Sequence, residues 1–190
     1  MNVGKTFYAR NRKEWRDWLA KHHRTATEIW LVYYKKDSGK PRIPYNHAVE
    51  EALCYGWIDS LVKPIDARRY AQRFSPRRPT SVLSDMNRER VRRLIAAKRM
   101  TKAGLAGISH VFDHKRDTKK KLPARIPADI LRRLKRDAVV WKNFQRFPES
   151  YKRIRIGWIA AARRRPATFS QRLRYFLKMT ARNKRFGMVQ

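Results

Sequence analysis

Apolar residues in the first third of the chain recur at helical and at strand spacing in turn. One amphipathic helix is indicated by positions i, i+3, i+4 and i+7, which are Trp15, Trp18, Leu19 and His22. Asn11 with Glu14 three residues later is the pair of residues that typically opens a helix. A second helix is predicted over 45–53, where Gly56 provides a natural stop. The chain therefore begins with helical elements on either side of a different pattern.

That different pattern is a run of β-branched and aromatic residues. Residues 29–34, IWLVYY, are too short and too apolar for a surface helix and predict a central strand. Residues 69–74 alternate in type and predict a second strand, which Pro76 and Pro79 end. Further helices are expected from Ser84 or Asp85 onward and from Thr101 through Leu105.

Beyond residue 110 the apolar pattern disappears and then returns with helical spacing only. The stretch DHKRDTKKKLPARIP is charged and interrupted by proline, which is typical of a linker or a long exposed loop. After it, helical faces are formed by Ile130, Leu131 and Leu134; Val140, Trp141 and Phe144; Tyr151, Ile154 and Trp158; and Leu173, Phe176, Leu177 and Thr180. Pro127, Pro148 and Pro166 stand where these helices would begin.

These patterns predict an α+β protein. Its N-terminal part, residues 1–109, would hold a small mixed or antiparallel sheet with helices. A charged linker over 110–126, a C-terminal helical module over 127–182 and a tail over 183–190 would follow.

Composition changes this picture mainly through charge. The 190 residues include 48 Lys and Arg against 15 Asp and Glu, which gives a net charge of +33. Such a charge attracts polyanions and keeps copies of the chain apart. No apolar stretch approaches the roughly 20 residues that span a bilayer, and the N-terminus lacks a secretory apolar run. We therefore expect a cytoplasmic protein.

Several classes of chemistry find no support in the sequence. The single Cys54 excludes an internal disulfide framework, and on an apolar helix face it is typical of a small buried residue. The five histidines show no ligand spacing, so no metal site and no cofactor are predicted. The phosphate-binding glycine motifs and the GxSxG motif of hydrolases are missing. No catalytic residue is assigned.

The segment 54–87 is the richest in candidate binding residues. A cleft there would bind an anionic ligand through Trp57, Asp59, Arg73, Arg77, Ser84 and Asn87. The two arginines would hold the anionic group, Ser84 and Asn87 would orient it at a helix N-terminus, and Trp57 would form an apolar wall. Ser84 and Asn87 share the helix face of Val91 and Leu94, and this face is expected to point inward.

Each of these residues also has a structural interpretation. Ser84 and Asn87 can cap a helix, and Trp57 can anchor the core. Asp59 or Asp66 can form a salt bridge with Arg73, Arg77 or Arg78. Asp59 is the one candidate acid or base if the cleft were an enzyme site. A further hypothesis is non-specific nucleic-acid binding by C-terminal helices whose polar faces carry arginine and lysine. No base-reading motif accompanies those helices.

Residues 50–105 resemble the YdeI/OmpD-associated family, also called bacteriocin-protection proteins. The resemblance rests on ALCYGWID, RFSPRR and a SxxSxxN pattern, on TATEIWLVYYKKDSGKPRI upstream, and on PADILRRLKRDAVVWKNFQRFPESYKRIRIGWIAAARRRPAT downstream. It covers nearly the whole chain except the charged linker and the last dozen residues.

The resemblance implies an α+β N-terminal part and a helical C-terminal part. It also implies a bacterial, cytoplasmic protein linked to stress or bacteriocin protection, and it supplies no reaction. Our leading hypothesis is a non-enzymatic protein that acts by binding. The net charge of +33 argues against direct capture of cationic peptides, because like charges repel over a Debye length of about 8 Å. Protection would then act through an anionic ligand, a membrane surface or nucleic acid.

Overall fold

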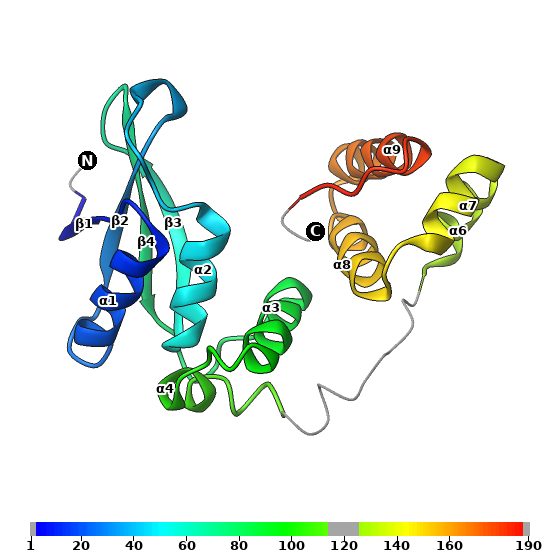
Figure 1. Cartoon of the computed structure of the whole chain (residues 1–190). Helices are drawn as coiled ribbons and strands as arrows, with labels where there is room; N and C mark the ends of the chain where they lie inside the picture. The colour runs from blue at the N-terminus through cyan, green and yellow to red at the C-terminus, as the bar shows by residue number, and fades with distance from the viewer. Residues whose placement is uncertain (1–2, 114–125, 188–190) are drawn as a thin grey trace. The chain divides into compact units, whose positions relative to one another are not determined.

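The computed structural model describes residues 3–113 and 126–187, which fall into two compact units. One unit comprises residues 1–83 and 90–114, and the other comprises residues 84–89 and 115–190. Most of the expected linker, residues 114–125, lies outside the described residues. The α+β class expected from the sequence is confirmed, with the sheet in the N-terminal unit and only helices after residue 126 (Figure 1).

The N-terminal unit is built on a four-stranded mixed sheet in the order β1-β2-β4-β3. The strands are β1 (Thr6–Tyr8), β2 (Ile29–Tyr34), β3 (Trp57–Pro64) and β4 (Arg69–Pro76). β1 runs parallel to β2, and the other neighbours are antiparallel. The predicted strand at 29–34 is confirmed residue for residue, and the strand expected over 69–74 extends to Pro76.

Two strands were not expected from the sequence, and both lie at an edge of the sheet. β1 has only three residues. β3 carries Leu61 and Val62 in exposed positions, and its pairing with β4 shifts register between Asp59 and Val62. An edge strand with a bulge has no clean alternation of apolar and polar residues, so its sequence does not resemble a strand.

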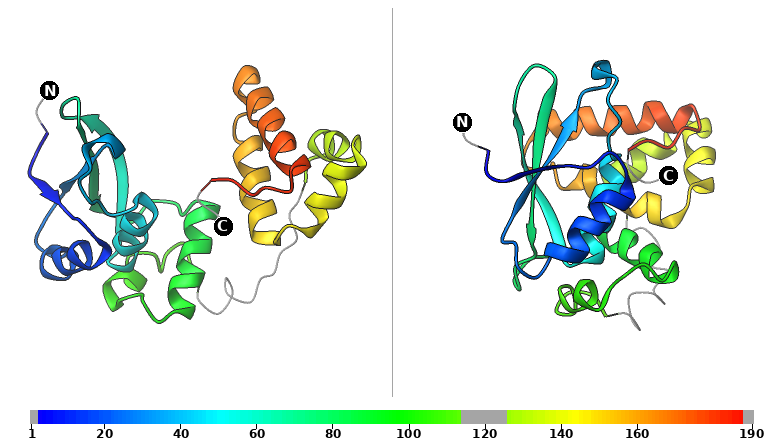
Figure 2. Two further views of the ribbon diagram at one scale, coloured as in Figure 1. Left: turned by 45° about the horizontal axis from the view of Figure 1, so that its top comes forward. Right: turned by 60° about the vertical axis from the view of Figure 1, so that its left-hand side comes forward.

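Helices α1 (Arg12–His22) and α2 (Tyr45–Cys54) cover one face of this sheet (Figure 2). The core between them contains Trp15, Leu19, Leu31, Trp57 and Phe74. The Asn11 cap is confirmed, since its side chain accepts a hydrogen bond from Glu14 N. A short 3₁₀ helix, η1 (Lys36–Ser38), follows β2.

The remaining helices of this unit follow β4, and α4 packs closely against the backbone at the end of α2. α3 (Asp85–Ala96) begins in the segment 84–89, and α4 (Lys102–Ala106) is capped by Thr101 as expected. Gly56 has a φ of +76°, the left-handed conformation that follows α2. Gly104 lies so close to Cys54 O that a Cβ would overlap it, which explains the glycine there.

The second face of the sheet is not covered by any helix that the structure describes in this unit (Figure 2). Alternation along β2 places Trp30, Val32 and Tyr34 on this face, since Ile29, Leu31 and Tyr33 belong to the core. Register adds Arg73 opposite Trp30 and Arg69 opposite Tyr34. The outer face therefore combines aromatic rings with arginines.

The C-terminal unit contains four helices over the described residues from 126 onward. They are α6 (Ala128–Lys135), α7 (Ala138–Arg146), α8 (Glu149–Ala160) and α9 (Pro166–Ala181). Their apolar faces meet in one core that includes Ile130, Phe144, Tyr151 and Phe176. The expected helical faces are confirmed, although Trp141 and Trp158 are only partly buried at the margin of this core.

Proline and aspartate define where these helices begin. Pro127 and Pro148 precede α6 and α8, and Pro166 is the first residue of α9. Asp137 caps α7 by accepting hydrogen bonds from Val139 N and Val140 N. Among the described residues, every helix is too short or too polar to cross a lipid bilayer.

Candidate functional site

The residues predicted to form a cleft occupy different environments. Trp57 is fully buried, and its Nε1 donates a hydrogen bond to His23 O at 3.2 Å. Asp59 is partly buried, and its Oδ2 accepts hydrogen bonds from Tyr45 Oη at 2.7 Å and Gln72 Nε2 at 2.8 Å. Trp57 therefore anchors the core, and Asp59 links α2 to β4.

Arg73 lies on the other face of the sheet. Asp59 pairs in register with Phe74, a core residue, whereas Arg73 pairs with Trp30 on the outer face. The Arg73 guanidinium forms an ion pair with Glu28 at 2.6 Å. The expected pairing of Asp59 or Asp66 with Arg73, Arg77 or Arg78 is wrong, because strand alternation separates Asp59 from Arg73 and Asp66 binds Arg69.

Arg77 is buried and holds its own loop together. Its Nη2 donates hydrogen bonds to Ser81 O at 3.4 Å and Val82 O at 3.1 Å. Burial lowers the pKa of this guanidinium, and no acidic side chain among the described residues pairs with it. Only Nη2 is engaged in this way, because Nε and Nη1 are buried without a hydrogen-bond partner among the described residues.

Ser84 and Asn87 belong to the segment 84–89, which groups with the C-terminal unit. Ser84 is exposed, and its Oγ accepts a hydrogen bond from Asn87 N at 3.3 Å. The expectation that both side chains point inward is wrong for Ser84, because a capping residue lies at the open end of its helix. A ligand-binding role for the six residues remains a prediction.

The remaining candidate chemistry in this unit is structural. Cys54 is fully buried, and burial raises the pKa of its thiol to about 11, so the thiolate is scarce at neutral pH. Within residues 3–113 and 126–187, no three acids, histidines or cysteines cluster closely enough to hold a metal ion.

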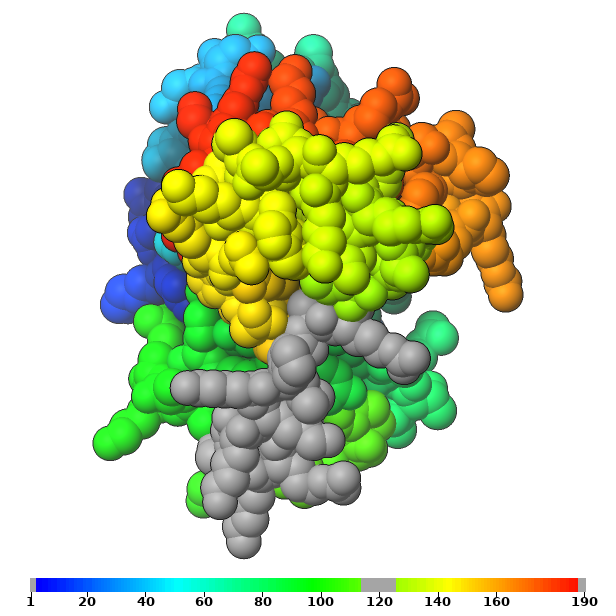
Figure 3. Space-filling view, turned by 90° about the vertical axis from the view of Figure 1, so that its right-hand side faces the viewer, coloured from blue at the N-terminus to red at the C-terminus, as the bar shows by residue number. Residues whose placement is uncertain are grey.

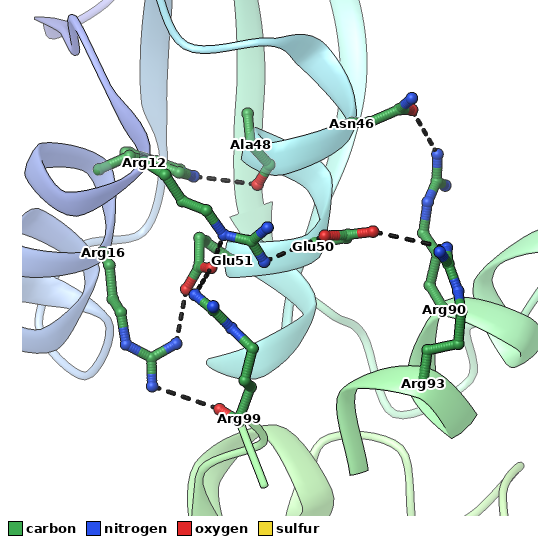
Figure 4. A network of polar contacts seen from close by, with 10 residues as sticks. Arg12, Arg16, Asn46, Ala48, Glu50, Glu51, Arg90, Arg93 and Arg99 are labelled. Atoms are coloured by element: carbon green, nitrogen blue, oxygen red, sulfur yellow. Dashed lines mark hydrogen bonds and ion pairs between the residues drawn. The ribbon is translucent and has the colours of Figure 1, made fainter. Parts of the chain in front are cut away.

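Two adjacent acids on α2 form a network of ion pairs with arginines (Figure 4). Glu51 is fully buried and binds Arg12, Arg16 at 2.6 Å and Arg99 at 2.6 Å. Glu50 binds Arg12 at 3.0 Å and Arg93 at 3.5 Å. This network joins α1, α2 and α3 and uses part of the positive charge of this unit for structure.

The helices after residue 126 contain few acids to neutralise their charge. Residues 126–187 contain eighteen lysines and arginines against three acids, a net charge of +15. All three acids are engaged: Asp129 with Arg163, Asp137 as the cap of α7, and Glu149 with Lys152. Glu89 of the segment 84–89 adds a pair with Arg153, and most of the other arginines have no ion pair with any described acid.

Several of these arginines converge on an open pocket of about 820 Å³ between α6 and α9. Its lining consists of Asp129, Arg132, Arg133, Arg136, Phe169, Ser170, Leu173 and Arg174. The four arginines are exposed and have no acidic partner among the residues that the structure describes. The pocket thus presents four guanidinium groups above an apolar floor.

A second pocket of about 360 Å³ extends this one along α9. It shares Arg133 and Arg136 with the first and adds Asp137, Val140, Leu177, Lys178 and Ala181. We call the two pockets together the basic groove. From Phe169 to Ala181 the groove follows twelve residues of helix, about 18 Å at 1.5 Å per residue.

The spacing of residues on α9 explains the character of the groove. Phe169, Leu173 and Leu177 recur every four residues and form the floor, and Arg174 and Lys178 follow in the adjacent row. One helical turn, about 6 Å, separates these two cations. An extended anionic chain lying along the helix would meet them in succession.

Asp129 is the one acid in the lining of the first pocket, and it cancels only part of the positive charge there because it is already paired. Asp129 Oδ1 accepts a hydrogen bond from Arg163 Nη2 at 2.7 Å, which lowers the pKa of the carboxyl group. The Arg163 guanidinium also lies 5.2 Å from the centre of the Phe169 ring. The space-filling view shows α6 and α7 as one continuous surface, with the segment that joins α8 to α9 protruding beside it (Figure 3).

The sequence pointed to these arginines but not to their common site. Arg132, Arg133, Arg136 and Arg174 are visible as basic residues on amphipathic helices. Their convergence depends on how α6 packs against α9, which periodicity does not determine. The one sequence signal is the four-residue recurrence of Ser170, Arg174 and Lys178 beside an apolar row.

Two family models match the chain. Residues 7–107 match a domain of unknown function, DUF8412, and residues 123–183 match the family described as bacteriocin-protection, YdeI or OmpD-associated. No curated protein and no solved structure matches the chain. The second match confirms the family resemblance for residues 123–183, where the basic groove lies. Residues 50–105, on which the resemblance also rested, match DUF8412 instead. The chain therefore belongs to the DUF8412 family and carries a bacteriocin-protection, YdeI or OmpD-associated domain in its C-terminal unit.

Proposed function

We propose that this protein binds nucleic acid through the basic groove, by contacts to the phosphate backbone and without sequence preference. The observation that carries the proposal is the convergence of Arg132, Arg133, Arg136 and Arg174 on one open pocket, where none of the described acids pairs with them. The protein would act by binding and would not catalyse a reaction.

Geometry and charge support this choice of ligand. A groove of about 18 Å spans roughly five base steps of one strand at 3.4 Å per step. Guanidinium groups donate paired hydrogen bonds to phosphate oxygens, and each contact releases condensed counterions. The net charge of +33 adds long-range attraction to any polyanion.

The apolar floor favours a backbone-binding role without base reading. Phe169, Leu173 and Leu177 offer no hydrogen bonds that would distinguish bases. The sugar edges of a strand can lie on such a floor while the phosphates face the arginines. The groove would therefore recognise an anionic strand rather than a sequence.

The family name suggests a protective role against bacteriocins. Direct capture of a cationic peptide by the C-terminal unit is disfavoured, because this unit carries a net charge of +15 over residues 126–187. Protection through a nucleic-acid partner agrees with that charge, and it requires no acidic surface on the protein.

The proposal is tested by titrating the full-length protein against a labelled 20-base-pair duplex of arbitrary sequence between 50 and 200 mM salt. The variant Arg132→Gln/Arg136→Gln/Arg174→Gln removes three groove charges. Each phosphate contact contributes about −0.9 to the slope of log K against log salt, so the slope should become less negative by about 3. Fluorescence anisotropy measures both the affinity and the slope.

A matched control keeps the overall charge equal. Arg146→Gln/Arg182→Gln/Arg185→Gln removes three exposed arginines of the same unit that do not line the groove. We expect this variant to retain most of the wild-type slope. Equal losses in the two triple variants would instead mean that binding is spread over the whole surface, and the groove would have no special role.

A further inference from the structure

A further open pocket, of about 440 Å³, lies in the N-terminal unit at one end of the outer face of the sheet. It lies where β2 leaves the sheet and where β3 connects to β4. Its lining consists of Tyr34, Ser38, Lys40, Asp66, Ala67, Arg68 and Arg69. Pockets of this size accommodate small ligands or single units of a larger one.

An aromatic ring forms one wall of this pocket. Tyr34 is half-buried on the uncovered face of the sheet, and the Tyr8 ring packs edge-on against it with 5.0 Å between ring centres. Tyr8 is itself held by a hydrogen bond from its hydroxyl to Pro41 O. The Tyr34 ring is therefore positioned by its neighbours, as a stacking platform must be.

Positive charges surround this ring. Lys40 Nζ lies 5.0 Å from the centre of the Tyr34 ring, and Arg68 is exposed beside it. Neither cation has an acidic partner among the described residues. Arg69 is paired with Asp66 at 2.6 Å, so the one acid of the pocket is already neutralised.

We infer that this pocket takes one unstacked base of a single-stranded nucleic acid on the Tyr34 ring, with the flanking phosphates at Lys40 and Arg68. The inference rests on the proposed function for its choice of ligand, and it adds a preference for single strands over duplexes. Charge alone does not separate single strands from duplexes, whereas a ring that stacks bases prefers strands whose bases are free.

The contact between Lys40 and Tyr34 does not block such a base. Lys40 is exposed on a flexible side chain, and a cation–π contact at an exposed site is weaker than the stacking of a base on an aromatic ring. A base would displace the ammonium group from the ring toward the neighbouring phosphate. The lysine then changes partner without losing its interaction.

The test compares a labelled 12-nucleotide oligothymidine with a 12-base-pair duplex, using the full-length protein at one salt concentration. We expect the wild type to bind the single strand more tightly per phosphate. Tyr34→Leu should weaken single-strand binding roughly tenfold, the effect of one lost stack, and should leave duplex binding within about twofold. Tyr34→Phe keeps the ring and should retain wild-type affinity.

Two controls separate this inference from the proposed function. Tyr175→Leu makes the same change at an exposed tyrosine of the C-terminal unit outside the groove lining, and it should preserve the single-strand preference. The groove triple variant should weaken both ligands. If Tyr34→Leu weakens both ligands equally, or if Tyr34→Phe weakens single-strand binding as much as Tyr34→Leu, the stacking site is overturned, whatever the groove variants show.

Discussion

Asp129 lines the basic groove, yet it forms an ion pair at 2.7 Å with Arg163, which enters from the connection between α8 and α9. Both side chains are substantially exposed, so the pair itself contributes little to folding stability. Its consequence is electrostatic. Asp129 places one negative charge in the groove lining, and it holds the positive charge of Arg163 close to itself.

Replacing Asp129 by Asn should therefore strengthen the binding of a polyanion. The change removes a negative charge near the incoming phosphates and frees Arg163 to contact them. One unit charge at about 4 Å is worth about 1 kcal/mol in water, so affinity for the duplex should rise roughly fivefold at 50 mM salt. Anisotropy titrations measure the change.

The matched control is Glu149→Gln, which makes the same change of charge in the same unit outside the groove lining. It should alter the affinity less than Asp129→Asn does. An equal gain in both variants would show that only the net charge of the protein matters.

The Glu51 network predicts a large loss of stability when its central carboxylate is removed. Glu51 is fully buried and holds Arg12, Arg16 and Arg99. Glu51→Gln leaves these arginines without their counter-charge, and breaking a buried pair in this way costs about 3 kcal/mol or more. Urea unfolding followed by tryptophan fluorescence measures the loss. Asp17→Asn, which breaks an exposed pair with Lys13, should leave the midpoint nearly unchanged.

The same network predicts how stability depends on pH. Burial alone would raise the pKa of Glu51, but hydrogen bonds from Arg12 and Arg16 outweigh it and lower the pKa. A carboxylate with a lowered pKa stabilises the folded state fully above its unfolded pKa, about 4.3. That stabilisation is lost as the pH falls through the folded pKa.

The difference in unfolding free energy between the wild type and Glu51→Gln should therefore be constant from pH 7 to about 5. It should shrink as the pH falls below about 4. Urea titrations at each pH give the difference directly. A difference that stays the same down to pH 3 would contradict the assigned pairing.

The helical core predicts unequal costs at two of its aromatic residues. Phe176 is fully buried and lies 6.1 Å from Phe144 and 6.5 Å from Tyr151, measured between ring centres. Phe176→Ala should cost about 3–5 kcal/mol. Trp158 is only partly buried and carries the Arg172 guanidinium 4.4 Å above its ring, so Trp158→Ala should cost less. Thermal and urea unfolding rank the two, and a reversed order would contradict the packing described for this core.

The elements that the sequence predicted well are those whose pattern is local. The apolar run at 29–34 and the proline-led helices after residue 126 follow from propensity and periodicity. β1 and β3 were missed because short or bulged edge strands draw their stability from a neighbouring strand, which a local pattern does not contain.

The candidate site shows the same division. The alternation of residues 69–74 was predicted from the sequence. Only the pairing register showed that Arg73 lies beside Trp30 and on the opposite face from Asp59. Ser84 was recognised as a helix cap, and its capping bond left it exposed. The residues of the cleft hypothesis are near one another in sequence. In the fold, Trp57 lies in the core, Arg73 lies on the outer face of the sheet, and Ser84 is exposed.

By itself the sequence determined the α+β class, the large positive charge and the family resemblance that residues 123–183 bear out. These follow from composition, from local spacing and from residue identity. Only the tertiary structure decided which charges are paired and which converge. Glu51 binds three arginines of the N-terminal unit, whereas the packing of α6 against α9 brings Arg132, Arg136 and Arg174 together with no ion pair to any described acid. The physical reason is that Coulomb interactions depend on distance in space, and residues far apart in the chain come close only when the helices pack.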